Sequence, residues 1–327
     1  MISKLIIRNF KSILELKITC KKLNIFIGEP NSGKSNILEA LALKSQNSVA
    51  GESLNGDIFR FKTISDLFFD FNINNPIEVI TDEGTTKLEY ALLPDGSPVN
   101  QFNYYFNYEA DKNKPYRLSH DGKVSNYGIV RKTDFRYYEF KRLTGFSLSY
   151  LPHLSVPHGD NLPSLLLSNS DLKKWVSEFL KSRDITLTLK PAENDLLGSK
   201  LINGEIYSYP YLALSETLQR IIFYILAIKS NKSSILLLDE PDSNTFPLYT
   251  KMLAERIALD KTNQFFIATH NPYLLLSLIE KSKEEDIALF VTKMKNYQTF
   301  ATCLDNKKLS KVVELNTDVF FNLDKLI

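Results

Sequence analysis

Four residues near the start of the chain have the types and spacing of a phosphate-binding loop. Gly28, Gly33, Lys34 and Ser35 lie in the segment GEPNSGKSN and satisfy the pattern Gly-x4-Gly-Lys-Ser/Thr. In such a loop, backbone N–H groups and the N-terminus of the following helix surround phosphate oxygens, because both carry partial positive charge. Lys34 would reach the β- and γ-phosphates, and the Ser35 hydroxyl would hold Mg²⁺. The predicted binding segment comprises Gly28, Glu29, Pro30, Asn31, Ser32, Gly33, Lys34, Ser35 and Asn36.

A pair of acids forms the second candidate element. The segment SSILLLDEPDS is an apolar run that ends in Asp239 and Glu240. A carboxylate at this position suits the surroundings of Mg²⁺, and the next one could align or deprotonate a water that attacks a γ-phosphate. Two acids after a buried strand are also typical of a solvated strand end. The phosphate loop upstream favours the functional interpretation.

A histidine forms the third candidate element. The run QFFIATHNPYLL ends in Thr269, His270 and Asn271 before a helix that Pro272 would start. His270 could hydrogen-bond a γ-phosphate from this strand end, although a single histidine there is also compatible with a structural role. The other three histidines, His120, His153 and His158, lie in loop-like sequence, and we assign them no function.

Alternating strands and helices would position these groups. Three β-branched segments, 2–7, 13–18 and 23–27, precede the loop, and helical spacing begins near Lys34. The last third predicts helices from Ser215, over 246–259 and over 272–279, with strands over 234–238, 264–268 and 287–291. This order indicates α/β layering, and we expect the N- and C-terminal thirds to share one sheet.

The middle of the chain has a different residue pattern. Phe and Tyr cluster between Phe59 and Tyr150, with breaks at Asp95-Gly96 and Asp121-Gly122 that suggest turns between antiparallel strands. The aromatic residues could form a base-stacking platform, but core packing and cross-strand pairs favour a structural role. Apolar residues at helical spacing over 172–180 predict an amphipathic helix, with Lys173, Lys174 and Lys181 on its solvated face.

Composition excludes several classes of protein. With 43% hydrophobic and 24% charged residues, the chain of 327 residues is typical of a folded globular protein. Forty Lys and Arg against thirty-eight Asp and Glu give a formal charge of +2, which by itself does not indicate nucleic-acid binding. Cys20 and Cys303 have no metal-ligand spacing, and the longest apolar runs are shorter than a membrane span. We expect a cytoplasmic protein without membrane insertion.

Together these segments resemble the ABC-type ATPase heads of the SMC and OLD families, the OLD-like branch most of all. The resemblance rests on IIRNFKSI, LNIFIGEPNSGKSNILEAL, HGDNLPSLLL, LALSETLQRIIFYILAI, ILLLDEPDSNTFP and FFIATHNPYLL. It implies an α/β P-loop fold with a mainly parallel sheet flanked by helices, an antiparallel β lobe and a long α+β insertion. Residues 1–45 and 205–305 would form the nucleotide-binding core, 46–204 the insertion and 306–327 a C-terminal tail.

The resemblance also implies roles for individual residues. ATP with Mg²⁺ would bind the loop, with Asp239 as the Walker B acid that supports the metal, Glu240 as the catalytic base and His270 as the switch histidine. Two copies would sandwich ATP, so that Ser215 at the start of the signature helix reaches the γ-phosphate held by the other copy. Asn9 and Lys11 match a family motif beside the nucleotide.

Two residues depart from the family pattern. Pro30 stands where Asn is usual and removes one loop N–H group, and Thr217 stands where the signature usually has Gly. Its Cβ would crowd the phosphate held by the other copy, which opposes the contact between copies and hydrolysis but not ATP binding. The glutamine of the Q-loop stays open between Gln46 and Gln101.

The leading hypothesis is therefore an ATP-dependent homodimer that hydrolyses ATP and drives a partner protein such as a nuclease, in nucleic-acid transactions or anti-phage defence. An ATPase subunit of a membrane transporter and a non-hydrolysing nucleotide switch are the alternatives. Many OLD-family proteins add a metal-dependent nuclease domain, but the acids after His270 are scattered through polar stretches. We expect no nuclease activity, and we interpret Glu284 to Asp286 as a solvated helix terminus.

Overall fold

A central sheet of six strands separates two hydrophobic cores. The computed structural model describes residues 1–45, 49–50, 53–92, 98–111, 114–127 and 133–326. The strand order is β11-β15-β16-β3-β17-β18, parallel except for the last strand. The strands are β3 (Leu23–Gly28), β11 (Phe135–Tyr138), β15 (Ile235–Asp239), β16 (Gln264–Ala268), β17 (Ile287–Lys295) and β18 (Gln298–Cys303). Their central members are apolar on both faces, as expected of parallel strands covered from two sides.

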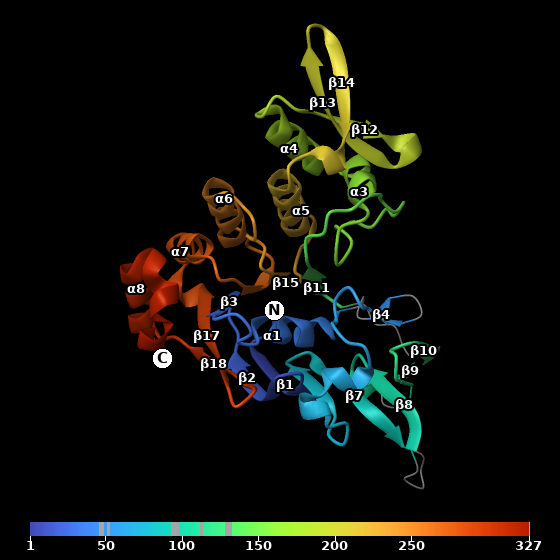
Figure 1. The fold of residues 1–327 in the computed structure, drawn as a ribbon, viewed down its shortest axis with the longest axis vertical. Coiled ribbons are helices and arrows are strands. Elements are labelled where there is room, and N and C mark those ends of the chain that lie inside the picture. The colour runs from blue at the N-terminus through green and yellow to red at the C-terminus, as the bar shows by residue number, and fades with distance from the viewer. Residues whose placement is uncertain (46–48, 51–52, 93–97, 112–113, 128–132, 327) are drawn as a thin grey trace.

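Alternate residues of these strands enter different cores. Ile25 and Ile27 of β3 belong to the core under the C-terminal helices, whereas Phe26 belongs to the core that contains helix α1 (Lys34–Ala42). The helices on the first face are α5 (Glu216–Ser230), α6 (Pro247–Ala258), α7 (Pro272–Lys281) and α8 (Asn306–Leu315), followed by the 3₁₀ segment η7 (Asn316–Leu326) (Figure 1). The helices predicted near 34, 215, 246 and 272 are confirmed within a few residues, but β18 and α8 were not predicted.

A seven-stranded antiparallel sheet lies on the other side of α1. Its order is β10-β9-β8-β7-β6-β1-β2. The strands are β1 (Lys4–Phe10), β2 (Ile13–Thr19), β6 (Ile77–Thr81), β7 (Gly84–Leu92), β8 (Pro98–Tyr105), β9 (Tyr116–Ser119) and β10 (Val124–Asn126). A two-stranded ribbon, β4 (Val49–Ala50) with β5 (Ser53–Leu54), and the short helix α2 (Tyr108–Asp111) accompany it.

The division of strands between the two sheets differs from the expectation. Of the three N-terminal strands only β3 joins the parallel sheet, and β11 from the middle of the chain completes that sheet. The physical reason is that β2 buries one face only and that β1 carries a partly exposed charge. This charge, Arg8, pairs with Glu15 of β2 and Glu78 of β6, which suits an open antiparallel sheet.

The aromatic residues of this lobe are mostly core residues. Tyr104, Phe106 and Tyr116 are buried and make edge-to-face or tilted contacts with one another. The core interpretation of the cluster is therefore confirmed for these side chains. The predicted turn at Asp121-Gly122 joins β9 to β10, with Gly122 in the left-handed region at φ 83°. Residues 95 and 96 lie outside the described residues.

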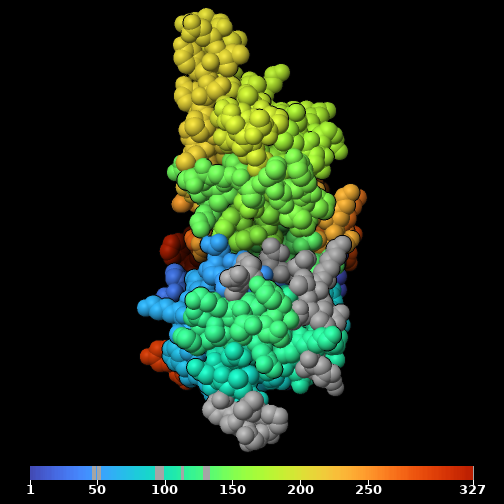
Figure 2. Space-filling model, turned by 90° about the vertical axis from the view of Figure 1, so that its right-hand side faces the viewer, coloured from blue at the N-terminus to red at the C-terminus, as the bar shows by residue number. Residues whose placement is uncertain are grey.

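An arm projects from the parallel sheet at the top of Figure 1. It contains α3 (Leu162–Ser168), α4 (Ser170–Lys181) and a small sheet of β12 (Thr186–Lys190), β13 (Asp195–Ile202) and β14 (Glu205–Pro210). The β13–β14 ribbon extends beyond the rest of the molecule (Figure 2). Helix α4 buries Leu172, Val176 and Phe179 and leaves its lysines exposed, as predicted from their spacing.

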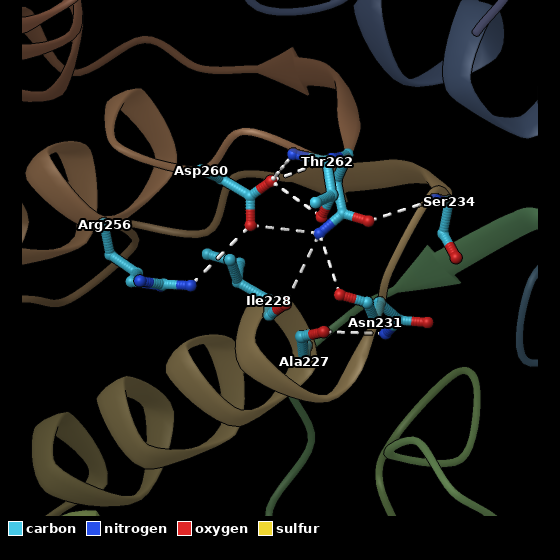
Figure 3. A network of polar contacts seen from close by, with 8 residues as sticks. Ala227, Ile228, Asn231, Ser234, Arg256, Asp260 and Thr262 are labelled. Atoms are coloured by element: carbon cyan, nitrogen blue, oxygen red, sulfur yellow. Dashed lines mark hydrogen bonds and ion pairs between the residues drawn. The ribbon is translucent and has the colours of Figure 1, made fainter.

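A buried polar network fixes the amino ends of β15 and β16 (Figure 3). Asp260 Oδ1 accepts hydrogen bonds from the backbone N–H groups of Thr262 (2.9 Å) and Asn263 (2.8 Å). The Asn263 side chain accepts from Ser234 N at 3.0 Å and donates to Asn231 O at 3.1 Å. Because these buried groups are all paired, the two strands start in a fixed register, and their carboxyl ends lie side by side.

Glu284, Glu285 and Asp286 form a single 3₁₀ turn before β17, and both glutamates are exposed. None of the helices in the described parts of the chain has the length and apolar character needed to cross a membrane.

Candidate active site

The phosphate loop connects β3 to α1 at the carboxyl edge of the parallel sheet. Gly33 caps the helix with φ 92°, a conformation that favours glycine. A Cβ on Gly33 would lie 1.9 Å from Thr299 Oγ1, and one on Gly28 would lie 2.4 Å from Thr292 Oγ1. Both glycines therefore allow the loop to approach β17 and β18 closely.

Lys34 points into the loop that it follows. Its Nζ donates to the carbonyl oxygens of Gly28 (3.0 Å) and Glu29 (2.8 Å). Burial lowers the pKa of Lys34, and the nearby carboxylates of Glu240 and Asp239 oppose that shift. The ammonium group is thus held where a phosphate chain in the loop would meet it.

An open cavity of about 460 Å³ lies over the loop. The cavity wall contains most residues of the predicted binding segment and one of the two candidate acids, Glu240. The lining residues are Pro30, Asn31, Ser32, Gly33, Lys34, Ser35, Asn36, Arg60, Glu240 and Met294. Gly28 is the last residue of β3, and Glu29 lines a smaller adjoining cavity of about 150 Å³.

Asp239 and Ser35 form a site that fits a divalent cation. Asp239 Oδ1 is buried and has no hydrogen-bond partner among the described residues. Burial raises the pKa of Asp239 to about 7, while its hydrogen bond with the Ser35 side chain acts in the opposite direction. A buried, unpaired carboxylate oxygen beside a hydroxyl group offers the hard oxygen ligands that Mg²⁺ prefers.

Glu240 and His270 meet across neighbouring strand ends. His270 Nδ1 lies 3.0 Å from Glu240 Oε1, and Ser243 Oγ donates to Glu240 Oε2 at 3.1 Å. Glu240 adopts φ 44°, which turns the chain sharply after β15. The two side chains are 43% and 58% exposed, and of the two Glu240 lines the cavity.

Ser215 lies elsewhere in the molecule. It caps the N-terminus of α5 and lines a separate cavity together with Lys200 and Tyr209 of the arm. Ser215 is exposed and does not line the phosphate cavity of its own chain. Thr217 Oγ1 donates to Asn244 O at 3.2 Å, which ties the start of α5 to the loop after β15.

Asn9 and Lys11 do not line the phosphate cavity either. Asn9 Nδ2 donates to the carbonyl oxygens of Asn72 and Asn75, and Lys11 pairs with Glu39 of α1. Gln101 lies in β8 and donates to Ser125 Oγ at 3.2 Å, far along the antiparallel sheet from the loop. Gln46 lies outside the described residues.

Arg60 is a cavity residue that the sequence did not indicate. Its guanidinium lines the cavity, and its Nε donates to Glu39 Oε1 at 2.9 Å. Glu39 is buried in α1 and pairs with both Arg60 and Lys11. No motif or periodicity marks an arginine in this loop, because its position depends on a side chain twenty-one residues away.

Two protein-family models together match most of the chain. Residues 1–194, more than half of the chain, match the model described as AAA ATPase domain. Residues 154–277 match a second AAA domain model, whose description names the AbiEii toxin and Type IV TA systems. No curated protein sequence matches the chain significantly.

Solved structures with the same fold include SMC heads. An Smc head bound to the C-winged helix domain of ScpA is 17% identical with a TM-score of 0.56, over 95% of this chain and 99% of that one. An Smc head with an extended coiled coil, bound to the C-terminal domain of ScpA derived from Pyrococcus furiosus, is 15% identical with a TM-score of 0.50. That match covers 96% of this chain and 98% of the other.

Proposed function

Because the chain belongs to the AAA ATPase domain family and has the fold of an SMC-like ABC-type head, we propose that it binds ATP with Mg²⁺ and hydrolyses it. The observation that carries the proposal is the convergence of Lys34, Ser35 and Glu240 on one cavity, with Asp239 and His270 beside them. These five residues come from the ends of the neighbouring parallel strands β15 and β16 and from helix α1, which follows β3.

Each residue has a distinct task in this proposal. Lys34 and the loop N–H groups neutralise the phosphate chain, while Ser35 and Asp239 hold Mg²⁺, which supplies electrostatic stabilisation of the transferred phosphoryl group. Glu240 accepts a proton from the water that attacks the γ-phosphate. His270 lies with its Nδ1 3.0 Å from Glu240 Oε1, and an N–H of its ring would donate to a γ-phosphate oxygen. The products are ADP and inorganic phosphate.

A second copy of the chain would complete the site. Phe246 and Tyr273 begin the neighbouring helices α6 and α7, at the edge that carries Glu240 and His270. They are 65% and 50% exposed and so offer apolar surface to a second copy. We propose that ATP closes a homodimer over this edge and that Ser215 contacts the nucleotide of the other copy.

The closure would act on a partner. Both SMC heads named above carry a bound ScpA domain, which supports a protein partner for this chain as well. We propose an OLD-like role in nucleic-acid transactions or anti-phage defence, in the cytoplasm, with an effector such as a nuclease. The match to the second AAA domain model, whose description names a putative AbiEii toxin of a Type IV TA system, supports a role in such a system.

A phosphate-release assay tests the proposal. The wild-type protein should release phosphate from ATP when Mg²⁺ is present, and Glu240→Gln should lower that rate by about a hundredfold or more, because the amide cannot accept the proton. Nucleotide affinity of the variant should stay unchanged, since Lys34 and Asp239 remain. If the wild-type protein binds ATP but releases no phosphate, it is a nucleotide switch. The loop N–H group that is missing at Pro30, which lines the cavity, would account for that result.

A further inference from the structure

Two loops carry the groups proposed for hydrolysis, and they are joined twice. The outer connection is the exposed contact between Glu240 and His270. Beneath it lies a buried connection between Asp242, two residues after Glu240, and Thr269, the residue before His270. Thr269 Oγ1 donates to the carboxylate of Asp242, at 3.1 Å from Oδ1 and 3.2 Å from Oδ2. Asp242 is 4% exposed and Thr269 is fully buried.

The Thr269 hydroxyl both donates and accepts hydrogen bonds in this arrangement. It gives its single proton to Asp242 and accepts the backbone N–H of Asn271 at 3.0 Å. The Thr269 backbone N–H donates to Phe26 O of β3 at 3.1 Å, so the residue is also fixed to the strand that leads into the phosphate loop. Thr269, which follows β16, is therefore joined to β3 through its backbone and to the loop after β15 through its side chain.

Asp242 is equally fixed on its own side. Its carbonyl oxygen accepts from Thr245 Oγ1 at 2.7 Å, just before α6 begins. Glu240 lies two residues earlier, and its backbone N–H donates to Ala268 O at 3.0 Å. The Glu240 backbone, Asp242 and the two neighbours of His270 are thus attached to the same buried framework.

The two connections differ in what they can hold in place. A contact between two side chains that are about half exposed is screened by water and contributes little to a fixed geometry. A buried, fully satisfied hydrogen bond to a carboxylate is stronger and leaves fewer alternative arrangements. The separation of Glu240 and His270 therefore depends on the buried pair more than on their own contact.

We propose that Asp242 and Thr269 are positioning residues, which hold Glu240 and His270 in the geometry that ATP hydrolysis needs. The inference rests on the proposed hydrolysis and adds two residues to it. Neither side chain lines the phosphate cavity, so they act through Glu240 and His270 and leave ATP binding to the loop.

The test replaces the hydroxyl group with a methyl group of the same size. Thr269→Val should lower kcat for ATP by about tenfold or more, because small misplacements of catalytic groups are costly, while KM and ATP affinity stay within about twofold of wild type. Thr269→Ser keeps the hydroxyl and should retain most of the wild-type kcat. Thr86→Val, which removes a buried hydroxyl in β7 that donates to Phe106 O, is the matched control and should keep full activity.

A double variant separates positioning from general damage. In the Glu240→Gln background, Thr269→Val should change the residual single-turnover rate little, because the group it positions is already lost. Wild-type kcat in Thr269→Val, or loss of ATP binding together with kcat, would overturn the positioning role. A wild-type protein without phosphate release would instead overturn the proposed function, and the positioning role with it.

Discussion

At the scale of single residues, burial determines the chemistry of the carboxyl edge. Asp242 lies under the loop after β15, and burial raises its pKa to about 6, while hydrogen bonds from its own backbone and from Thr269 act in the opposite direction. The folded protein therefore binds a proton at Asp242 more tightly than the unfolded chain does. Between the two pKa values, stability must fall as pH rises.

This gives a prediction for the pH dependence of stability. The free energy of unfolding should contain a contribution from Asp242 that decreases by about 1 kcal/mol between pH 5 and pH 7. Asp242→Asn removes that contribution, so the variant should gain about 1 kcal/mol relative to wild type over the same interval. Urea unfolding of both proteins at the two pH values measures the difference.

The exposed acid Glu285 provides the control for this measurement. Glu285→Gln should have the same free energy of unfolding as wild type at both pH values. Identical pH dependence of wild type and Asp242→Asn would mean that the carboxyl group is not held in a proton-binding environment.

At the scale of elements, the strands that the sequence predicts most clearly are those with both faces buried. The apolar runs of β3, β15 and β16 mark their positions, and Asp239, Glu240 and His270 can be located because each lies at or just after the end of such a run. The pattern of β1 and β2 shows that one face is buried, but it does not identify the sheet that the strands join. That depends on pairing with β6, about seventy residues away.

Other parts of the site depend on contacts that no local pattern contains. Arg60 reaches the cavity because Glu39 of α1 binds its guanidinium. The side chain of Thr299 in β18 lies against Gly33, so an element that the sequence did not indicate shapes the phosphate loop. The positioning pair Asp242 and Thr269 has no motif either, because it forms only when β15 and β16 lie side by side.

At the scale of the whole molecule, Ser215 does not line the phosphate cavity of its own chain, so the proposed contact with nucleotide must be made between copies. Lys34→Ala should abolish ATP binding, and Ser215→Arg should block the contact with the nucleotide of the other copy, so each variant alone should be inactive. A mixture can form dimers in which one site has both groups intact. Part of the phosphate-release activity should therefore return on mixing, if one intact site suffices.

The mixed dimers must be shown to form before that result is interpreted. Subunits carrying two different fluorescent labels report exchange by energy transfer in the presence of ATP. Exchange without any recovered activity would argue that Ser215 does not act on the nucleotide of the other copy.

The account depends above all on ATP binding at the phosphate loop, where Lys34 Nζ lies 2.8 Å from Glu29 O. Calorimetric titration of Mg-ATP into wild type, Lys34→Ala and Lys190→Ala tests this most directly. Lys190 is the matched control, because its Nζ pairs with Glu193 in the arm and it lines neither cavity beside the loop. We predict binding to wild type and Lys190→Ala with similar affinity and no measurable binding to Lys34→Ala. Wild-type affinity in Lys34→Ala would contradict the account.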